Sequence, residues 1–108
     1  MFDFQSFSSY FHSAVDVTME VGAQIIVRGL VQGVGFRYFV YEHATKLGLN
    51  GFVVNRYDGS VEIISVGDRS LIEELIRYVK AGPRAADVRD VIITWNEPDE
   101  GYRRFEIR

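Results

Sequence analysis

The sequence predicts an α+β sandwich in which two helices cover one face of a mainly antiparallel sheet, in the order β-α-β-β-α-β, with a short extra strand at the C-terminus. Three observations support this fold class: apolar residues alternate in several short runs, they recur at helical spacing in two others, and Asp58-Gly59 marks a tight turn between two of the strands. With 108 residues, of which 47% are hydrophobic, the chain is long enough to bury one core. We therefore expect a single domain.

A strand, a loop and a helix open the patterned part of the chain. Residues 24–30 alternate and are rich in Ile and Val, as is typical of a strand. A glycine-punctuated loop follows, and Gly48 is placed to end the helix after it. The apolar residues at helical spacing in this segment are Phe36, Phe39, Val40, Ala44 and Leu47.

The middle of the chain predicts a hairpin followed by a second helix. Two apolar runs, residues 51–55 and 59–66, flank the Asp58-Gly59 turn. Ser70 and Glu73 have the spacing of a capping box at the start of the helix, and Gly82-Pro83 ends it. Its apolar side consists of Leu71, Leu75 and Val79.

The C-terminal part supplies two more strands. Residues 88–95 form the fourth strand, and the alternation of Phe105 and Ile107 with charged residues predicts a short closing strand. The resulting βαββαβ order is that of ferredoxin-like folds, in which the first strand lies inside the sheet. Trp95 and Tyr102 are interpreted as packing residues, and Glu73 with Arg77 as an i,i+4 surface pair.

Charge and composition limit the partners of this domain. Residues 1–20 hold three acidic residues and no Lys or Arg, so residues 21–108 carry 12 of each sign and are electrically balanced. A nucleic-acid binder usually has a basic excess, which argues against nucleic acid as a partner and against an RNA-binding module on a similar sheet. No apolar run approaches the about 20 residues of a membrane span. We expect no membrane association.

The absence of cysteine and the character of the first residues predict a cytoplasmic protein. Without cysteine there are no disulfides and no thiolate zinc sites, and the start of the chain lacks the basic and apolar regions of a secretory signal. Residues 1–20 are expected to be a flexible extension of a domain spanning residues 21–108, with residues 1–18 dispensable. A docked helix or partner-binding peptide is the alternative, because Phe4, Phe7, Phe11 and Val15 could share one helical face.

The loop after the first strand is the best candidate for an anion site. Between Val21 and Tyr41 there are two arginines, Arg28 and Arg37, and no carboxylate. Two glycines in the loop at residues 31–35 allow successive N–H groups to point into one concavity, to which a helix N-terminus adds partial positive charge. Arg37 could donate two parallel hydrogen bonds to a phosphoryl group there. The alternative is a plain turn with a surface arginine.

Asn55 ends the second strand, just before the hairpin turn. A turn asparagine usually caps its own backbone. In the βαββαβ order, however, the end of strand two and the loop after strand one could lie close together. The Asn55 amide could then hold a water molecule beside the loop.

Two long motifs resemble those of one family. Gly-Leu-Val-Gln-Gly-Val-Gly-Phe-Arg at residues 29–37 resembles the phosphate loop of the acylphosphatases, and residues 51–61 through Gly67 resemble their second signature. The resemblance spans about residues 24–108. Val54 departs from the pattern, because the family usually has a longer, polar or small residue there. Alternation places Val54 on the sheet face opposite Asn55, so we expect it to affect packing and not the reaction.

The resemblance implies hydrolysis of acyl phosphates to a carboxylate and inorganic phosphate without metal or cofactor. By default we expect a monomer. The resemblance also implies that Asn55 positions the attacking water and that Arg37 binds the phosphoryl group together with the main-chain amides of the loop. Those amides belong to Gln32, Gly33, Val34, Gly35, Phe36 and Arg37. The alternative is a non-catalytic module of the acylphosphatase-like type that binds phosphate or carbamoyl phosphate.

Overall fold

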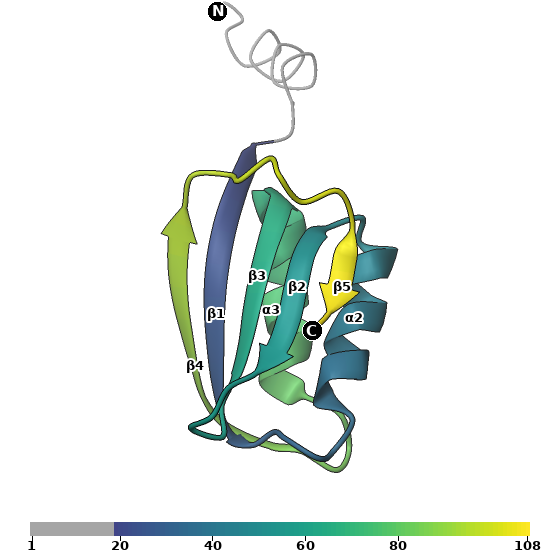
Figure 1. The fold of residues 1–108 in the computed structure, drawn as a ribbon, viewed down its shortest axis with the longest axis vertical. Helices are drawn as coiled ribbons and strands as arrows, with labels where there is room; N and C mark the ends of the chain where they lie inside the picture. Colours follow the sequence, from purple (N-terminus) through teal and green to yellow (C-terminus); the bar gives the residue numbers. More distant parts are fainter. Residues whose placement is uncertain (1–18) are drawn as a thin grey trace, which may run out of the picture.

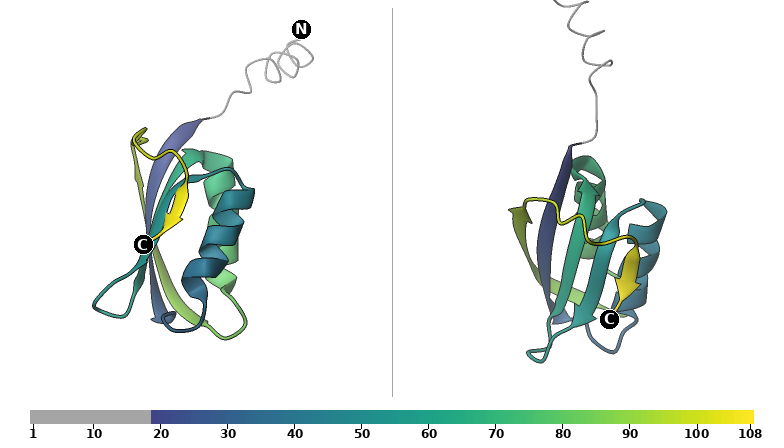
Figure 2. Two further views of the ribbon diagram at one scale, coloured as in Figure 1. Left: turned by 45° about the vertical axis from the view of Figure 1, so that its right-hand side comes forward. Right: turned by 45° about the horizontal axis from the view of Figure 1, so that its top comes forward.

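The computed structural model describes residues 19–108, which form one five-stranded sheet with both helices on one of its faces (Figures 1 and 2). The predictions made for residues 1–18 lie outside the described residues. Within the described part, no helix is long and apolar enough to cross a bilayer. The strands are β1 (Glu20–Leu30), β2 (Asn50–Asn55), β3 (Val61–Asp68), β4 (Asp87–Asn96) and β5 (Phe105–Ile107), and the helices are α2 (Phe36–Lys46) and α3 (Arg69–Ala81).

The sheet has the strand order β4-β1-β3-β2-β5. All pairs are antiparallel except β2 with β5, which is parallel. The predicted fold class, including the two helices on one face and the short closing strand, is confirmed. Because β1 and β2 are both antiparallel to β3, their C-terminal ends lie at the same edge of the sheet. Figure 1 shows the β1–α2 loop and the β2–β3 hairpin together at this lower edge.

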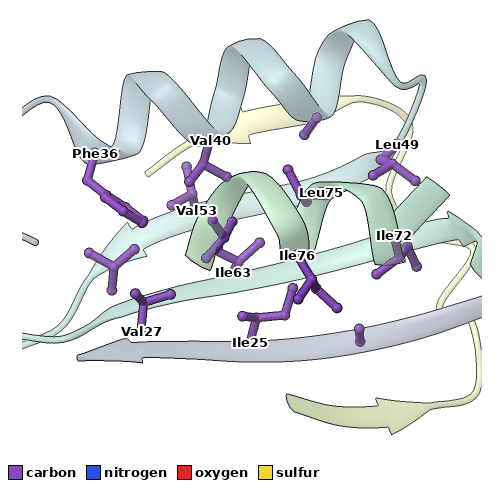
Figure 3. Packing of buried hydrophobic residues seen from close by; sticks show 14 of the residues in the cluster. Ile25, Val27, Phe36, Val40, Leu49, Val53, Ile63, Ile72, Leu75 and Ile76 are labelled. Carbon is purple, nitrogen blue, oxygen red and sulfur yellow. The ribbon is translucent and has the colours of Figure 1, made fainter. Parts of the chain in front are cut away.

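The core lies between the sheet and the helices. On β1, Ile25 and Val27 point inward and are fully buried, whereas Ile26 between them faces the open side of the sheet. From the helices, Phe36 and Leu75 close over the same layer (Figure 3). Burying each of these side chains contributes about 1.5–3 kcal/mol to folding. This packing holds β1 and α2 in place on either side of the loop that joins them.

The sheet begins earlier than the sequence predicts. β1 starts at Glu20 rather than at residue 24, and Glu20 pairs with Asp68 of β3. The start of the strand has no clear apolar alternation, because the buried residues there, Gly22 and Ala23, are small. Glu20 thus belongs to the folded domain and not to the predicted extension of residues 1–20.

The predicted capping box at α3 is wrong. The helix begins at Arg69, one residue before Ser70, with Asp68 as its extended N-cap residue. Since β3 runs up to Asp68 and Arg69 N donates to Met19 O (3.0 Å), the end of the strand decides where the helix starts. The Ser70 hydroxyl donates to the Asp68 carboxylate instead of capping the backbone.

The charged residues on α3 also pair differently from the prediction. Glu73 accepts a hydrogen bond from Arg69 Nε at 3.2 Å, and Arg77 lies 3.6 Å from Glu74. The expected pair of Glu73 with Arg77 is therefore replaced by two others. All four side chains are exposed or half-exposed, so these pairs contribute little to stability.

Candidate active site

The β1–α2 loop has the backbone geometry of an anion site. Gly33 and Gly35 have φ values of 75° and 78°, in the left-handed region that favours glycine. Gly35 is the N-cap residue of the 11-residue helix α2, whose first turn has no acidic residue and no capping side chain. The positive end of the helix and its first N–H groups are thus left for another acceptor.

A pocket of about 210 Å³ lies at this end of the domain. It contains both loop glycines, Arg37 of α2 and Asn55 of β2, and Arg37 is the one charged residue in its lining. The full lining is Val31, Gly33, Gly35, Phe36, Arg37, Tyr38, Asn55 and Ile107. The pocket therefore combines main-chain donors, one guanidinium and one carboxamide, which suits a small oxyanion.

Not every residue of the predicted phosphate loop lines this pocket. Val34 packs against the hydrophobic core, and Gln32 directs its side chain toward the β2–β3 hairpin. Conversely, Tyr38 and Ile107 belong to the lining although no pattern in the sequence assigns them to the site. Ile107 arrives there because β5 pairs in parallel with β2. Its alternation with charged residues predicted the strand but not the strand's neighbour.

Arg37 is held by the end of β5. Its Nη1 donates to the main-chain oxygen of Arg108 at 2.8 Å, and Arg108 N in turn donates to Val53 O of β2 at 2.8 Å. The guanidinium is therefore linked through Arg108, the residue after β5, to the strand that carries Asn55. This link constrains the guanidinium while leaving its other N–H groups as donors.

Asn55 carries an unusual acceptor. Its Oδ1 is buried and has no hydrogen-bond partner among the described residues. Leaving a buried polar atom unpaired costs about 1–3 kcal/mol. Among the described residues, Ser65 Oγ is in the same situation, but only Asn55 also lines the pocket. The turn that follows is capped not by Asn55 but by Asp58, whose Oδ1 accepts from Ser60 N (2.9 Å) and Ser60 Oγ (2.6 Å).

The same contacts set the ionisation of Asp58. Hydrogen bonds from the Ser60 hydroxyl and then from the Ser60 N–H, with a smaller contribution from the Arg56 guanidinium, hold the pKa of Asp58 below its ordinary value. Asp58 is exposed and does not line the pocket with Asn55 and Arg37. Its charge shapes the hairpin, and the pocket itself contains no carboxylate or histidine.

Two further residues, His43 and Val54, lie away from the pocket. His43 stacks on Tyr78 of α3, with ring centroids 3.9 Å apart, and is half-buried between the helices. Val54 is half-buried on the open face of the sheet, opposite Val53, which agrees with the predicted alternation. Across residues 19–108, no three His, Cys, Asp or Glu side chains gather where they could hold a metal ion.

Fold and pocket together define a ferredoxin-like domain with a glycine-containing loop and a small pocket at one edge of its sheet. Comparison with known proteins specifies the family. The acylphosphatase family model matches residues 23–107. The acylphosphatase of Trichormus variabilis is 47% identical over 88 residues, which cover 82% of this chain and 86% of the relative. The chain belongs to the acylphosphatase family.

Solved structures agree with this assignment. The acylphosphatase from Bacillus subtilis superposes with a TM-score of 0.79 at 43% identity, covering 82% of this chain and 98% of that one. Full-length HypF, solved in a phosphate- and nucleotide-bound form, matches with a TM-score of 0.78 at 33% identity, over 85% of this chain and 12% of HypF. The predicted family, fold and acylphosphatase activity are thereby confirmed at the level of the family.

Proposed function

We propose that this chain hydrolyses small acyl phosphates with Arg37 and the loop amides as the phosphoryl-binding groups and Asn55 as the residue that positions the attacking water. The observation that supports these roles is the single pocket lined by Gly33, Gly35, Arg37 and Asn55. Its volume of about 210 Å³ fits a phosphoryl group with a short acyl chain better than a drug-sized ligand, which needs about 300 Å³ or more.

Binding of the phosphoryl group requires little beyond what the loop offers. Main-chain N–H groups at the start of α2 face the oxyanion, and the helix dipole adds partial positive charge. Arg37 keeps free donors while its Nη1 is bonded to Arg108 O. In phosphoryl transfer the charge spreads over the three equatorial oxygens, so fixed donors around them lower the barrier without any covalent step by the protein.

The water is placed by the unpartnered oxygen of Asn55. Oδ1 accepts a hydrogen bond from the water, and this contact aims the water oxygen at phosphorus. The new P–O bond forms as the P–O bond to the acyl group breaks, and its electron pair leaves with the carboxylate. A phosphoryl oxygen takes the water's proton. No protein base is involved, in keeping with a pocket lining that contains no carboxylate or histidine.

The leaving group explains why no general acid is needed. A carboxylate with a pKa of about 4 departs unprotonated, whereas the alkoxide of a phosphate monoester would require a proton donor. We therefore expect this chain to release phosphate from acetyl phosphate and not from a simple alkyl phosphate.

The test compares Arg37→Ala and Asn55→Ala with wild type, with Arg28→Ala as the matched control. Arg28 is the second arginine of the carboxylate-free segment, but it lines a different pocket. Each site variant should release phosphate from acetyl phosphate on the order of 100- to 1,000-fold more slowly. Arg28→Ala should match wild type. Folded site variants with full turnover would refute the assigned roles.

Inhibition by inorganic phosphate and the melting temperature distinguish the role of Arg37 in binding from the role of Asn55 in positioning water. Arg37→Ala should weaken inhibition by inorganic phosphate, whereas Asn55→Ala should lower kcat with little change in that inhibition. Because Asn55 Oδ1 is buried without a partner, Asn55→Ala should not lower the melting temperature. A large loss of stability in Asn55→Ala would show that the amide serves the fold.

The second candidate is a module that binds phosphate or carbamoyl phosphate without turnover. The match to HypF at a TM-score of 0.78 supports it, but the identity there is 33%, against 47% and 43% for the acylphosphatases compared above. Tight phosphate binding by wild type without hydrolysis of acetyl phosphate would favour this module over the enzyme.

The proposal extends to a cytoplasmic enzyme that works as a monomer, without metal or organic cofactor and without nucleic acid. The balanced charge and the absence of cysteine support this. Sedimentation should give one species near 12.4 kDa, and a chelator should leave phosphate release unchanged. A dimer, or inhibition by the chelator, would contradict these points.

A further inference from the structure

The side chain of Gln32 connects the phosphate loop to the hairpin that follows Asn55. Its Nε2 donates to Arg56 O at 2.7 Å and to Ser60 O at 2.9 Å. These two oxygens lie at opposite ends of the five-residue turn of the hairpin. One amide group thus holds both ends of the turn, and the main chain of the loop is left to face the pocket.

The hairpin held by Gln32 is closed by its own hydrogen bonds. Arg56 N donates to Ser60 O (2.9 Å), Gly59 N to Arg56 O (3.1 Å), and Ser60 N to Asp58 Oδ1 (2.9 Å). Ser60 is 3% exposed, which anchors one end in the core. A displacement of this turn would therefore carry Asn55, the residue directly before Arg56, along with it.

The sheet does not join the phosphate loop to Asn55 directly. β3 lies between β1, which leads into the phosphate loop, and β2, which ends at Asn55. No main-chain hydrogen bonds of the sheet therefore join β1 to β2. On one side of the pocket the connection runs from Arg37 through Arg108 to Val53. On the other side it runs through Gln32.

We propose that Gln32 is a positioning residue that sets the separation between the phosphate-binding loop and the Asn55 amide. The proposal rests on the function assigned above, because a water held by Asn55 must approach phosphorus in line with the leaving carboxylate. A misplacement of about 1 Å can cost about 100-fold in rate. Gln32 therefore acts on turnover through Asn55, while phosphate binding by the loop and Arg37 continues without it.

The test uses Gln32→Met, which keeps the length of the side chain and removes the donor. The matched control is Gln24→Met, because the half-buried Gln24 on β1 loses one comparable hydrogen bond, to Glu62 Oε2 at 2.9 Å, away from the pocket. We expect kcat for acetyl phosphate to fall about 10- to 100-fold in Gln32→Met, with inhibition by inorganic phosphate nearly unchanged. Gln24→Met should match wild type in both. A Gln32→Met variant that matches Gln24→Met overturns the proposal.

A double-variant cycle tests whether Gln32 acts through Asn55. Once Asn55→Ala has removed the amide, adding Gln32→Met should slow turnover no further. Losses that multiply would show that Gln32 acts on the loop itself, which overturns the proposal. A purely structural role would lower kcat and phosphate affinity together and would lower the melting temperature in proportion.

A second measurement keeps this inference separate from the proposed function. Crystal structures of wild type and Gln32→Met with inorganic phosphate should show the loop unchanged and Asn55 displaced relative to it. If wild type does not hydrolyse acetyl phosphate, the proposed function fails, and the crystal structures still decide the positioning role. An Asn55 in the same place in both structures overturns it.

Discussion

Replacing Gly33 or Gly35 by alanine should separate phosphate binding from the stability of the fold. Both residues have left-handed φ values, 75° and 78°, and a Cβ at either would meet no atom within 4 Å. The substitution therefore costs backbone strain alone, about 1–2 kcal/mol, because no neighbouring atom has to move. For a domain of this size that corresponds to a melting temperature lower by about 4–8 °C per kcal/mol.

The effect on phosphate should exceed the effect on stability. A loop that relaxes toward negative φ turns one or two N–H donors away from the pocket, and a hydrogen bond to a charged group is worth about 1.5–3 kcal/mol. Each lost donor should weaken phosphate binding about 10- to 100-fold. Calorimetric titration with inorganic phosphate and a thermal melt of the same sample measure the two effects.

Gly48→Ala is the matched control for both substitutions. Gly48 has a φ of 74° and equally open surroundings, but it lies past the other end of α2. It should lose as much stability as Gly33→Ala or Gly35→Ala and bind phosphate like wild type. If all three variants bind phosphate equally well, the loop amides are not the phosphate site. If all three lose binding in step with stability, the loss reports unfolding.

Three further predictions concern pH, the core and the N-terminus. Because the pKa of Asp58 is lowered in the folded state, its charge stabilises the hairpin above the ordinary pKa of about 3.9 and ceases to do so as pH falls through the lowered value. The melting-temperature difference between wild type and Asp58→Asn should thus be constant from about pH 5 to 8 and shrink below about pH 4; a difference unchanged at pH 3 would contradict this. Ile63→Ala, at a fully buried position of β3, should lower the free energy of unfolding by about 2–5 kcal/mol in urea titrations, and a cost below about 1 kcal/mol would mean that the core refills the space. A chain beginning at Met19 should keep its activity and melting temperature, because the contacts of Met19 with Asp68 and Arg69 remain; loss of either would assign residues 1–18 a role.

Local signals in the sequence were enough to predict the order of the helices and strands. They also predicted the two parts of the pocket, the loop before Arg37 and the strand end at Asn55. Alternation and helical spacing are properties of neighbouring residues, so the strands around Ile25 and Ile63 and the helix from Phe36 could be predicted. The positive φ values of Gly33 and Gly35 likewise follow from residue type in a tight loop.

The wrong predictions concern the start of α3 and the ion pairs on it. Ser70 and Glu73 fit a capping box that would make Ser70 the N-cap, two residues after the N-cap observed at Asp68. The expected partner of Glu73 was Arg77, but Glu73 pairs with Arg69 in the first turn. The start is decided by the length of β3, which depends on its pairing with Glu20 across 48 residues of chain. No periodicity within the helix contains that information.

What the sequence determined by itself is therefore the fold class, the loop chemistry and the family, because each depends on residue types at short spacing. The element order already suggested that the end of β2 and the loop after β1 lie close together. The tertiary structure alone decided the pairing of β5 with β2, which brings Ile107 to the pocket and the main-chain oxygen of Arg108 to Arg37. It also turned Gln32 away from the pocket and onto the hairpin. The Gln32 and Arg37 side chains donate to main-chain oxygens far away in the chain. Every residue carries such an oxygen, so residue type does not reveal which one is chosen.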